Sequence, residues 1–205
     1  MRIRPDTPVL LMLAKACNII LLTLVWAVCC APVVTIGAAT TALYTVMWRI
    51  SAGQDVRVIR EFWDAMRTNW KVATASWGIM LLVGLLLAGN MVALSGVQAP
   101  PALLTLMKGA AGLVLISYLI VLHYLFAGIA KYYVTIPQAF KNAWLWGMAS
   151  LPRTLVLFCL SAVSVILIYF LEWLSIILLA YTIYLQAVIL NHIFLQYENR
   201  KHAEP

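Results

Sequence analysis

The chain has 205 residues, of which 64% are hydrophobic and 10% are charged, and its formal net charge is +7. A soluble domain is about half apolar and about a quarter charged, so this composition excludes a globular domain with one anchor. It predicts an all-α polytopic transmembrane helical bundle. The positive charge could indicate nucleic acid, but the basic residues lie in the connections between apolar runs, and we therefore expect no nucleic-acid partner.

Six apolar runs could cross a bilayer, which requires about 20 residues of helix. Pro32 separates the first two runs, because proline removes a backbone donor and clashes with the preceding turn. The second run is only about 25 Å long as a helix, so it either crosses fully or re-enters. The expected organisation is one integral membrane domain, residues 1–205, with spans at 9–31, 33–49, 72–95, 102–130, 154–171 and 174–195, the last two separated by a turn at Glu172.

Basic residues determine the expected orientation. With six spans, thirteen of the fourteen Lys and Arg residues fall on one side, and the exception is Lys108. The positive-inside rule therefore predicts a multi-pass plasma-membrane protein with both termini in the cytoplasm. A five-span alternative, with residues 9–49 as one bent helix, would place Arg2, Arg4 and Lys15 outside.

Two connections are expected to form amphipathic cytoplasmic interfacial helices, at residues 55–71 and 136–147. In the first, the apolar residues Ile59, Phe62, Trp63, Met66 and Trp70 recur with a period of 3.6 residues. The spacing also predicts the ion pairs Arg57–Glu61 and Arg60–Asp64. The residues expected to contact a partner or lipid are Arg57, Arg60, Phe62, Trp63, Arg67 and Trp70.

No residue pattern indicates catalysis. Hydrolases and transferases need paired acids, or a nucleophile with its base. Glu61 and Asp64 are explained as partners of neighbouring arginines, and the four cysteines lie inside apolar runs without metal-ligand spacing. We therefore expect neither an enzyme nor a cofactor or metal site.

Polar residues within the spans are the sharper candidates for a site, because burying them in lipid is costly. His123 lies in the fourth span, and Asn191 and His192 lie late in the sixth. Both spans run inward, so the two histidines could share a level in the membrane. A proton- or substrate-responsive site and hydrogen bonding between helices both explain such residues.

The run APVVTIGAATTALY at 31–44, followed by WRI and FWDAMRTNWKVATASW, resembles the YesL-like family of bacterial integral membrane proteins. The matched residues are Pro32, Thr35, Gly37, Ala38, Thr41, Ala42, Leu43, Tyr44, Phe62 and Asn69. The segments AFKNAW at 139–144 and LPRT at 151–154 are similar to that family's second cytoplasmic segment. The resemblance implies a small plasma-membrane protein of uncharacterised function, often in bacteria that take up complex plant carbohydrates. It supplies no catalytic residues.

The motif that follows the first run is expected to be structural before it is functional, because glycine permits a close helix approach. Its residues are Pro32, Thr35, Gly37, Thr41 and Tyr44. Three functions remain open. The first is an accessory or regulatory component of a membrane complex such as a carbohydrate uptake system. The others are a small transporter or channel and a lipid-binding membrane-organising protein. The expected partners are the bilayer, transporter subunits or further copies of the chain.

Overall fold

The computed structural model describes residues 8–96, 100–132, 134–170 and 175–203. These residues contain no β-strand, and the prediction of an all-α fold is confirmed. The turn predicted at Glu172 lies outside the described residues. The elements are α1 (Pro8–Cys29), the short 3₁₀ helix η1 (Val33–Thr35), α2 (Ile36–Ser51), α3 (Val58–Gly96), α4 (Pro101–Lys131), α5 (Ile136–Ala149), α6 (Leu151–Phe170) and α7 (Ser175–Ala203).

The length and composition of these helices are those of a multi-pass membrane protein. In the described part of the chain, five helices are long and apolar enough to cross a bilayer. Helices α5 and α6 meet at an angle of 99°, and they provide a sixth crossing if the bent pair acts as one span. The expected polytopic bundle is therefore confirmed, with five to six candidate spans.

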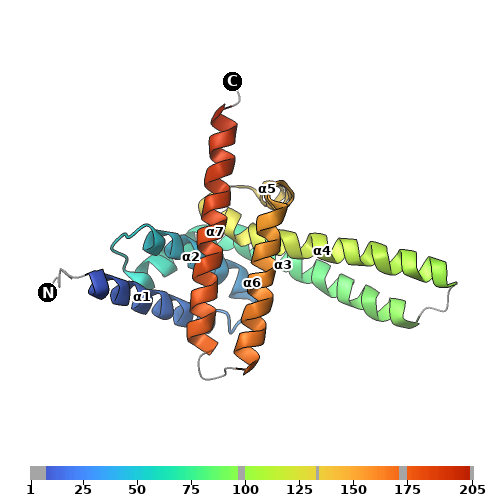
Figure 1. Ribbon diagram of the computed structural model, residues 1–205, viewed down its shortest axis with the longest axis horizontal. Coiled ribbons are helices and arrows are strands. Elements are labelled where there is room, and N and C mark those ends of the chain that lie inside the picture. Colours follow the sequence, from blue (N-terminus) through green and yellow to red (C-terminus); the bar gives the residue numbers. More distant parts are fainter. Residues whose placement is uncertain (1–7, 97–99, 133, 171–174, 204–205) are drawn as a thin grey trace.

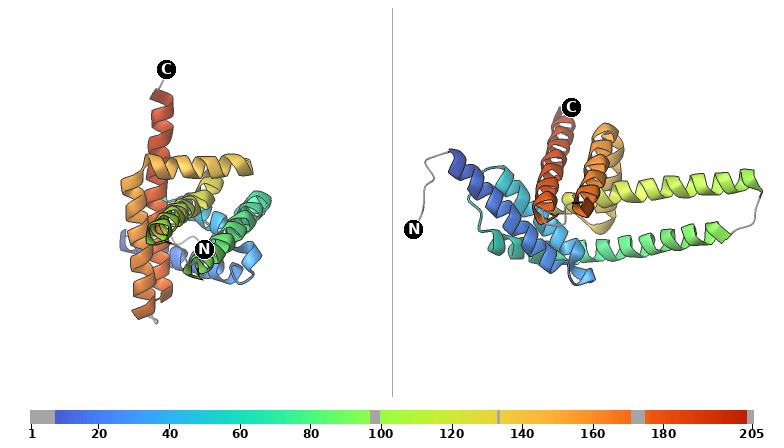
Figure 2. Two further views of the ribbon diagram at one scale, coloured as in Figure 1. Left: turned by 90° about the vertical axis from the view of Figure 1, so that its right-hand side faces the viewer. Right: turned by 60° about the horizontal axis from the view of Figure 1, so that its bottom comes forward.

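Two helical hairpins radiate from a common core, as Figure 1 shows. Helices α3 and α4 form one hairpin, and its far end projects away from the other helices. Helices α6 and α7 form the second hairpin, which runs across the first in every view (Figures 1 and 2). Helix α2 packs against α1, α3, α4 and α7, and ten of its sixteen residues are buried.

The projecting half of the α3–α4 hairpin has an apolar surface. Leu85 and Leu86 on α3 are 70% and 66% exposed, and Leu106 and Leu113 on α4 are 70% and 69% exposed. A contiguous surface of this kind would be unfavourable in water. It is the surface expected of helices that face lipid.

Helix α3 differs from the prediction, because residues 58–96 form one helix where an interfacial helix and a separate span were expected. No residue near the expected junction ends a helix, since the segment holds no proline and its first glycine is Gly78. Thirty-nine residues make a helix of about 58 Å, roughly twice the thickness of the hydrocarbon core. The last charged residue of α3 is Lys71. If the uncharged half crosses the bilayer, the charged half continues along the same axis and does not turn into the membrane plane.

Candidate functional site

The turn between α1 and α2 is closed by the protein's own donors. The hydroxyl of Thr35 lies 2.6 Å from the carbonyl oxygen of Cys29 and 2.7 Å from that of Pro32. The indole N–H of Trp77 on α3 donates to the carbonyl of Val33 at 2.7 Å. These bonds satisfy carbonyl groups that a break between apolar helices would otherwise leave without partners.

Gly37 is the point of closest approach between α2 and α3. A Cβ atom at this position would lie 2.6 Å from the carbonyl oxygen of Ala73 and 2.6 Å from Cβ of Trp77. Thr41 is buried, and its hydroxyl donates to the carbonyl of Gly37 at 2.9 Å. Tyr44 lies further along the same helix and is also buried in the core, with 8% of its surface exposed. The motif therefore joins α2 to α3.

The predicted apolar face of the charged half of α3 is divided between two environments. Phe62 and Met66 are buried, with exposures of 0% and 8%, and belong to the core cluster that includes α2. Ile59, Trp63 and Trp70 are 53%, 47% and 44% exposed. Packing against α2 thus uses only part of the apolar face.

The exposed apolar residues share their side of α3 with two arginines. At about 100° per residue, the five side chains fall within an arc of about 100°. Tryptophan and arginine are the residue types most enriched among energetically dominant interface residues. We call this surface the α3 stripe, and its residues are Ile59, Arg60, Trp63, Arg67 and Trp70.

A groove of about 480 Å³ lies beside the start of this stripe, between α1 and α3. The buried residues Val56 and Val58 contribute its apolar part. The charged residues in its lining are both arginines. The groove is lined by Asn18, Leu21, Val56, Arg57, Val58, Ile59 and Arg60.

The ion pairs of this region differ in part from the prediction. Glu61 pairs with Arg49 of α2 at 2.8 Å, and its second oxygen accepts a hydrogen bond from the backbone N–H of Arg57 at 3.2 Å. Arg57 precedes the first residue of α3, so the carboxylate binds the helix start in place of the expected guanidinium. The predicted pair Arg60–Asp64 is present at 4.0 Å, with side chains 72% and 67% exposed. At that distance and exposure it contributes little to stability.

His123 joins three helices through a polar network. Its Nε2 atom lies 2.9 Å from the hydroxyl of Ser161 on α6, and the amide of Gln186 on α7 donates to the same hydroxyl at 2.9 Å. The Nδ1 atom lies 3.1 Å from the carbonyl oxygen of Leu119. If Nδ1 carries the proton, Nε2 accepts the proton of Ser161. Both ring nitrogens have protein partners, so the geometry favours hydrogen bonding between helices.

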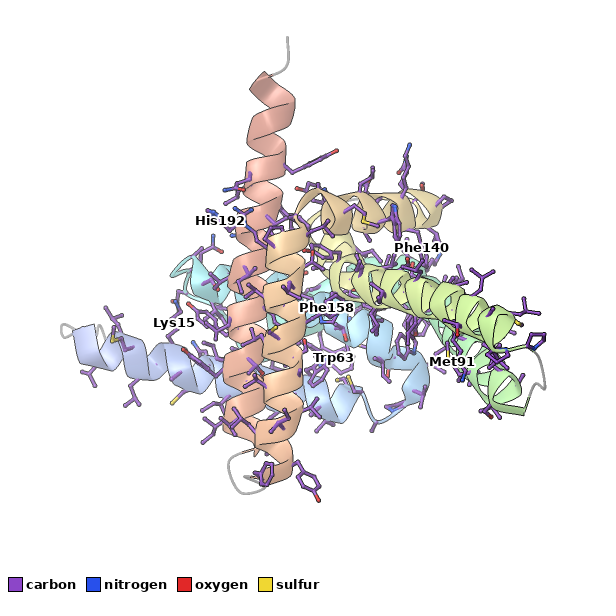
Figure 3. All side chains as sticks on the ribbon, turned by 45° about the vertical axis from the view of Figure 1, so that its right-hand side comes forward. Lys15, Trp63, Met91, Phe140, Phe158 and His192 are labelled. Carbon is purple, nitrogen blue, oxygen red and sulfur yellow. The ribbon has the colours of Figure 1, made fainter. Side chains whose placement is uncertain are left out.

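Asn191 and His192 lie apart from this network. The side-chain oxygen of Asn191 is 3.5 Å from the ammonium group of Lys131 on α4. His192 is exposed on the side of α7 opposite α6 (Figure 3), and its Nε2 atom lies 3.1 Å from the amide nitrogen of Gln196. Within the described residues no hydrogen bond joins His123 to either residue, so the structure does not combine them into the shared site that the sequence allowed.

Four partners in the contacts of the predicted polar residues were missed from the sequence, namely Lys131, Ser161, Gln186 and Gln196. Each is a polar residue within or at the end of an apolar run, which is the signal that singled out the histidines. The presence of a polar residue in an apolar run does not specify which helix faces pack together. The pairing therefore required the structure.

These features define the class: an all-α polytopic membrane protein with a buried packing motif and an exposed, basic, aromatic helix face. The model of a family described as "Protein of unknown function, DUF624" matches residues 19–91. The match covers the second half of α1, all of α2 and most of α3, and it includes both the packing motif and the α3 stripe. No curated protein and no solved structure matches the chain.

Proposed function

We propose that the protein is a non-catalytic accessory or regulatory component of a plasma-membrane complex, and that it docks a protein partner through the α3 stripe. The observation that carries this proposal is the continuity of α3. Its apolar half has the length and composition of a membrane span, and its charged half continues the same helix, so the proposal places the charged half outside the membrane. The stripe then presents two half-exposed tryptophans to water, where large apolar side chains gain from being covered.

The charge of the surface indicates the kind of partner. Arg60 and Arg67 flank the exposed apolar residues of the stripe, and Arg57 lines the adjoining groove. Two exposed acidic residues nearby, Asp55 and Asp64, oppose these three arginines, so the surface is basic overall. A complementary partner is a protein segment that offers an apolar anchor flanked by Asp or Glu residues, because complementary charge steers association and fixes its register.

The resemblance to the YesL-like family also suggests the kind of membrane complex to which the protein belongs. It points to the subunits of a carbohydrate uptake system as the class of partner. The basic connections favour a cytoplasmic position for the stripe, together with cytoplasmic termini. A second copy of the same chain is the alternative occupant.

Two observations make the other functions weaker candidates. Discontinuous helices in transporters expose unwound carbonyl groups to an ion or substrate. Here the carbonyl of Cys29 accepts from the hydroxyl of Thr35, that of Pro32 from the backbone N–H of Thr35, and that of Val33 from the indole of Trp77. A lipid-organising helix would lie in the membrane plane, whereas the charged half of α3 continues the axis of the apolar half.

Photocrosslinking in native membranes tests the proposal. A photoreactive amino acid replaces Trp63, and the matched control places it at Leu85, which is 70% exposed on the apolar half of α3. The expected result is that position 63 crosslinks to protein peptides that carry acidic and apolar residues, while position 85 crosslinks to lipid. Crosslinks from position 63 to lipid alone would contradict the proposal, and crosslinks to the chain's own peptides would identify self-association.

Replacing both Arg60 and Arg67 by lysine separates recognition by a protein from attraction to lipid. The substitution keeps the charge but removes planar, bidentate donors. We expect the crosslinking yield at position 63 to fall roughly tenfold, which is the loss for about 1.4 kcal/mol of binding free energy. Binding of the purified protein to anionic liposomes should change little. A parallel fall in both measurements would favour lipid as the occupant.

A further inference from the structure

A second cavity lies away from the α3 stripe, between the α5–α6 junction and α7. Its volume is about 310 Å³. Among the described residues that line it, Arg153 is the one charged residue, and none is Asp or Glu. Its lining includes Trp146, Pro152, Arg153, Ile193, Gln196 and Tyr197.

The cavity sits where both of its helices change from apolar to polar. On α6, Arg153 and Thr154 precede the apolar run that begins at Leu155. On α7, the apolar run ends near Leu195, and Gln196 follows it. Helices α6 and α7 form one hairpin (Figure 1), so the two transitions coincide. The headgroup layer is the depth at which such a transition is stable.

Arg153 is held in place by a chain of side chains. One of its terminal nitrogens donates to the side-chain oxygen of Gln196, whose amide nitrogen lies 3.1 Å from Nε2 of His192. This bond occupies one of the five N–H donors of the guanidinium. A fixed guanidinium with further donors matches the oxygens of a phosphate group, which it can bind in a bidentate manner.

The walls of the cavity complement this charge. Trp146 and Ile193 are 5% and 4% exposed and provide an apolar side, and the ring of Tyr197 lies 6.2 Å from that of Trp146. Trp and Tyr commonly lie at headgroup depth, with an apolar body and a polar tip. The cavity therefore combines one cationic donor with apolar walls, as an amphiphile with a single negative headgroup requires.

We infer that this cavity binds the phosphate group of an anionic phospholipid such as phosphatidylglycerol, with Arg153 as the phosphate ligand. A phospholipid and a soluble phosphate ester would offer the same phosphate-ester group to the site. The cavity lies at the ends of two apolar runs, and this position favours the lipid over the soluble ester. This site is independent of the α3 stripe and of the proposed docking function. Pro152 and Arg153 of the LPRT segment would then both line this lipid-binding site.

Native mass spectrometry of the full-length protein in detergent tests the site, with added phosphatidylglycerol, phosphatidylcholine or glycerol 3-phosphate. The decisive variant is Gln196→Glu, which keeps the size of the side chain, pairs with Arg153 and places a negative charge in the cavity. We expect the wild-type protein to retain one phosphatidylglycerol, and Gln196→Glu to bind it at least about tenfold more weakly. Lys141→Gln is the matched control, because it removes one exposed charge on α5 outside the cavity and should leave retention unchanged.

Three results would overturn the inference. Equal retention by the wild-type protein and Gln196→Glu would show that the anion binds elsewhere. Equal retention of phosphatidylcholine, or an equal loss in Lys141→Gln, would indicate only general attraction to lipid. Retention of glycerol 3-phosphate without phosphatidylglycerol would replace the lipid by a soluble phosphate ester.

Discussion

At Gly37, the backbones of α2 and α3 approach so closely that no side chain fits between them. The nearest atoms are a carbonyl oxygen and a Cβ atom of α3, and neither can move without shifting the helix. The neighbouring Thr41 returns its hydroxyl proton to its own helix, so it presents only a small apolar methyl group to its surroundings. Small residues that permit such contacts supply much of the packing energy between helices in membranes.

The substitution Gly37→Ala should therefore destabilise the protein by about 1–3 kcal/mol, the usual cost of overpacking a tight core. Thermal unfolding of the detergent-purified protein, followed by size-exclusion chromatography, measures this as a lower Tm. Gly37→Leu should abolish the folded yield, and Pro32→Ala should have a milder effect. Gly78→Ala is the control, because a Cβ there meets no atom within 4 Å and should be neutral or slightly stabilising. Equal Tm values for the two alanine variants would refute the close contact.

The chemistry of single residues allowed some of these structural roles to be predicted. The other roles depend on which helix faces pack together. A glycine amid small residues after a proline indicated a close approach, which the structure places at Ala73 and Trp77. His123 was recognisable as a costly polar residue in a span. Its partner Ser161 lies 38 positions away. Nothing in the periodicity of two apolar runs specifies their relative rotation, so that contact could not be predicted.

The same limit applies to whole helices. The 3.6-residue period predicted an amphipathic helix over residues 55–71, where α3 begins at Val58, yet it did not show where this helix ends. A change from charged to uncharged composition was interpreted as a boundary between two helices, although Lys71 and Val72 are both compatible with a continuous helix. Composition changes with the environment of a helix, whereas a helix ends at residues that break or cap it.

The continuity of α3 can be measured as a distance. Spin labels at Arg60→Cys and Leu86→Cys are separated by 26 residues, which corresponds to about 39 Å along one helix. Pulsed electron paramagnetic resonance on the protein in nanodiscs should give a narrow distribution near that value. A helix that turned into the membrane plane at Lys71 would bring the labels to about 28 Å, by the same rise per residue. The shorter distance would restore the interfacial helix.

At the scale of the whole molecule, α2 and the ends of its neighbouring helices form a buried centre, from which two apolar hairpins extend (Figure 2). The polar contacts gather near that centre and at the ends of the apolar runs. The tips of the hairpins are apolar, with Val92 and Tyr169 73% and 79% exposed. The tip of the α3–α4 hairpin and the charged half of α3 lie at opposite ends of one continuous helix, so we expect them on different sides of the membrane.

Cysteine accessibility tests that arrangement in intact cells. Gly96→Cys and Tyr169→Cys, at the ends of the two hairpins, should react with a membrane-impermeant reagent from outside. Arg60→Cys and Lys141→Cys should react only after permeabilisation, because the basic connections are expected in the cytoplasm. Reaction of Arg60→Cys in intact cells would reverse the proposed orientation.

The most direct measurement is the environment of Trp63 in the purified protein reconstituted into nanodiscs. A spin label at Trp63→Cys is compared with one at Leu85→Cys, using a water-soluble paramagnetic reagent and lipid-dissolved oxygen. If the α3 stripe is a docking surface outside the membrane, position 63 should be accessible to the water-soluble reagent and position 85 to oxygen. If position 63 instead behaves like position 85, the stripe lies in lipid, and the docking function is contradicted.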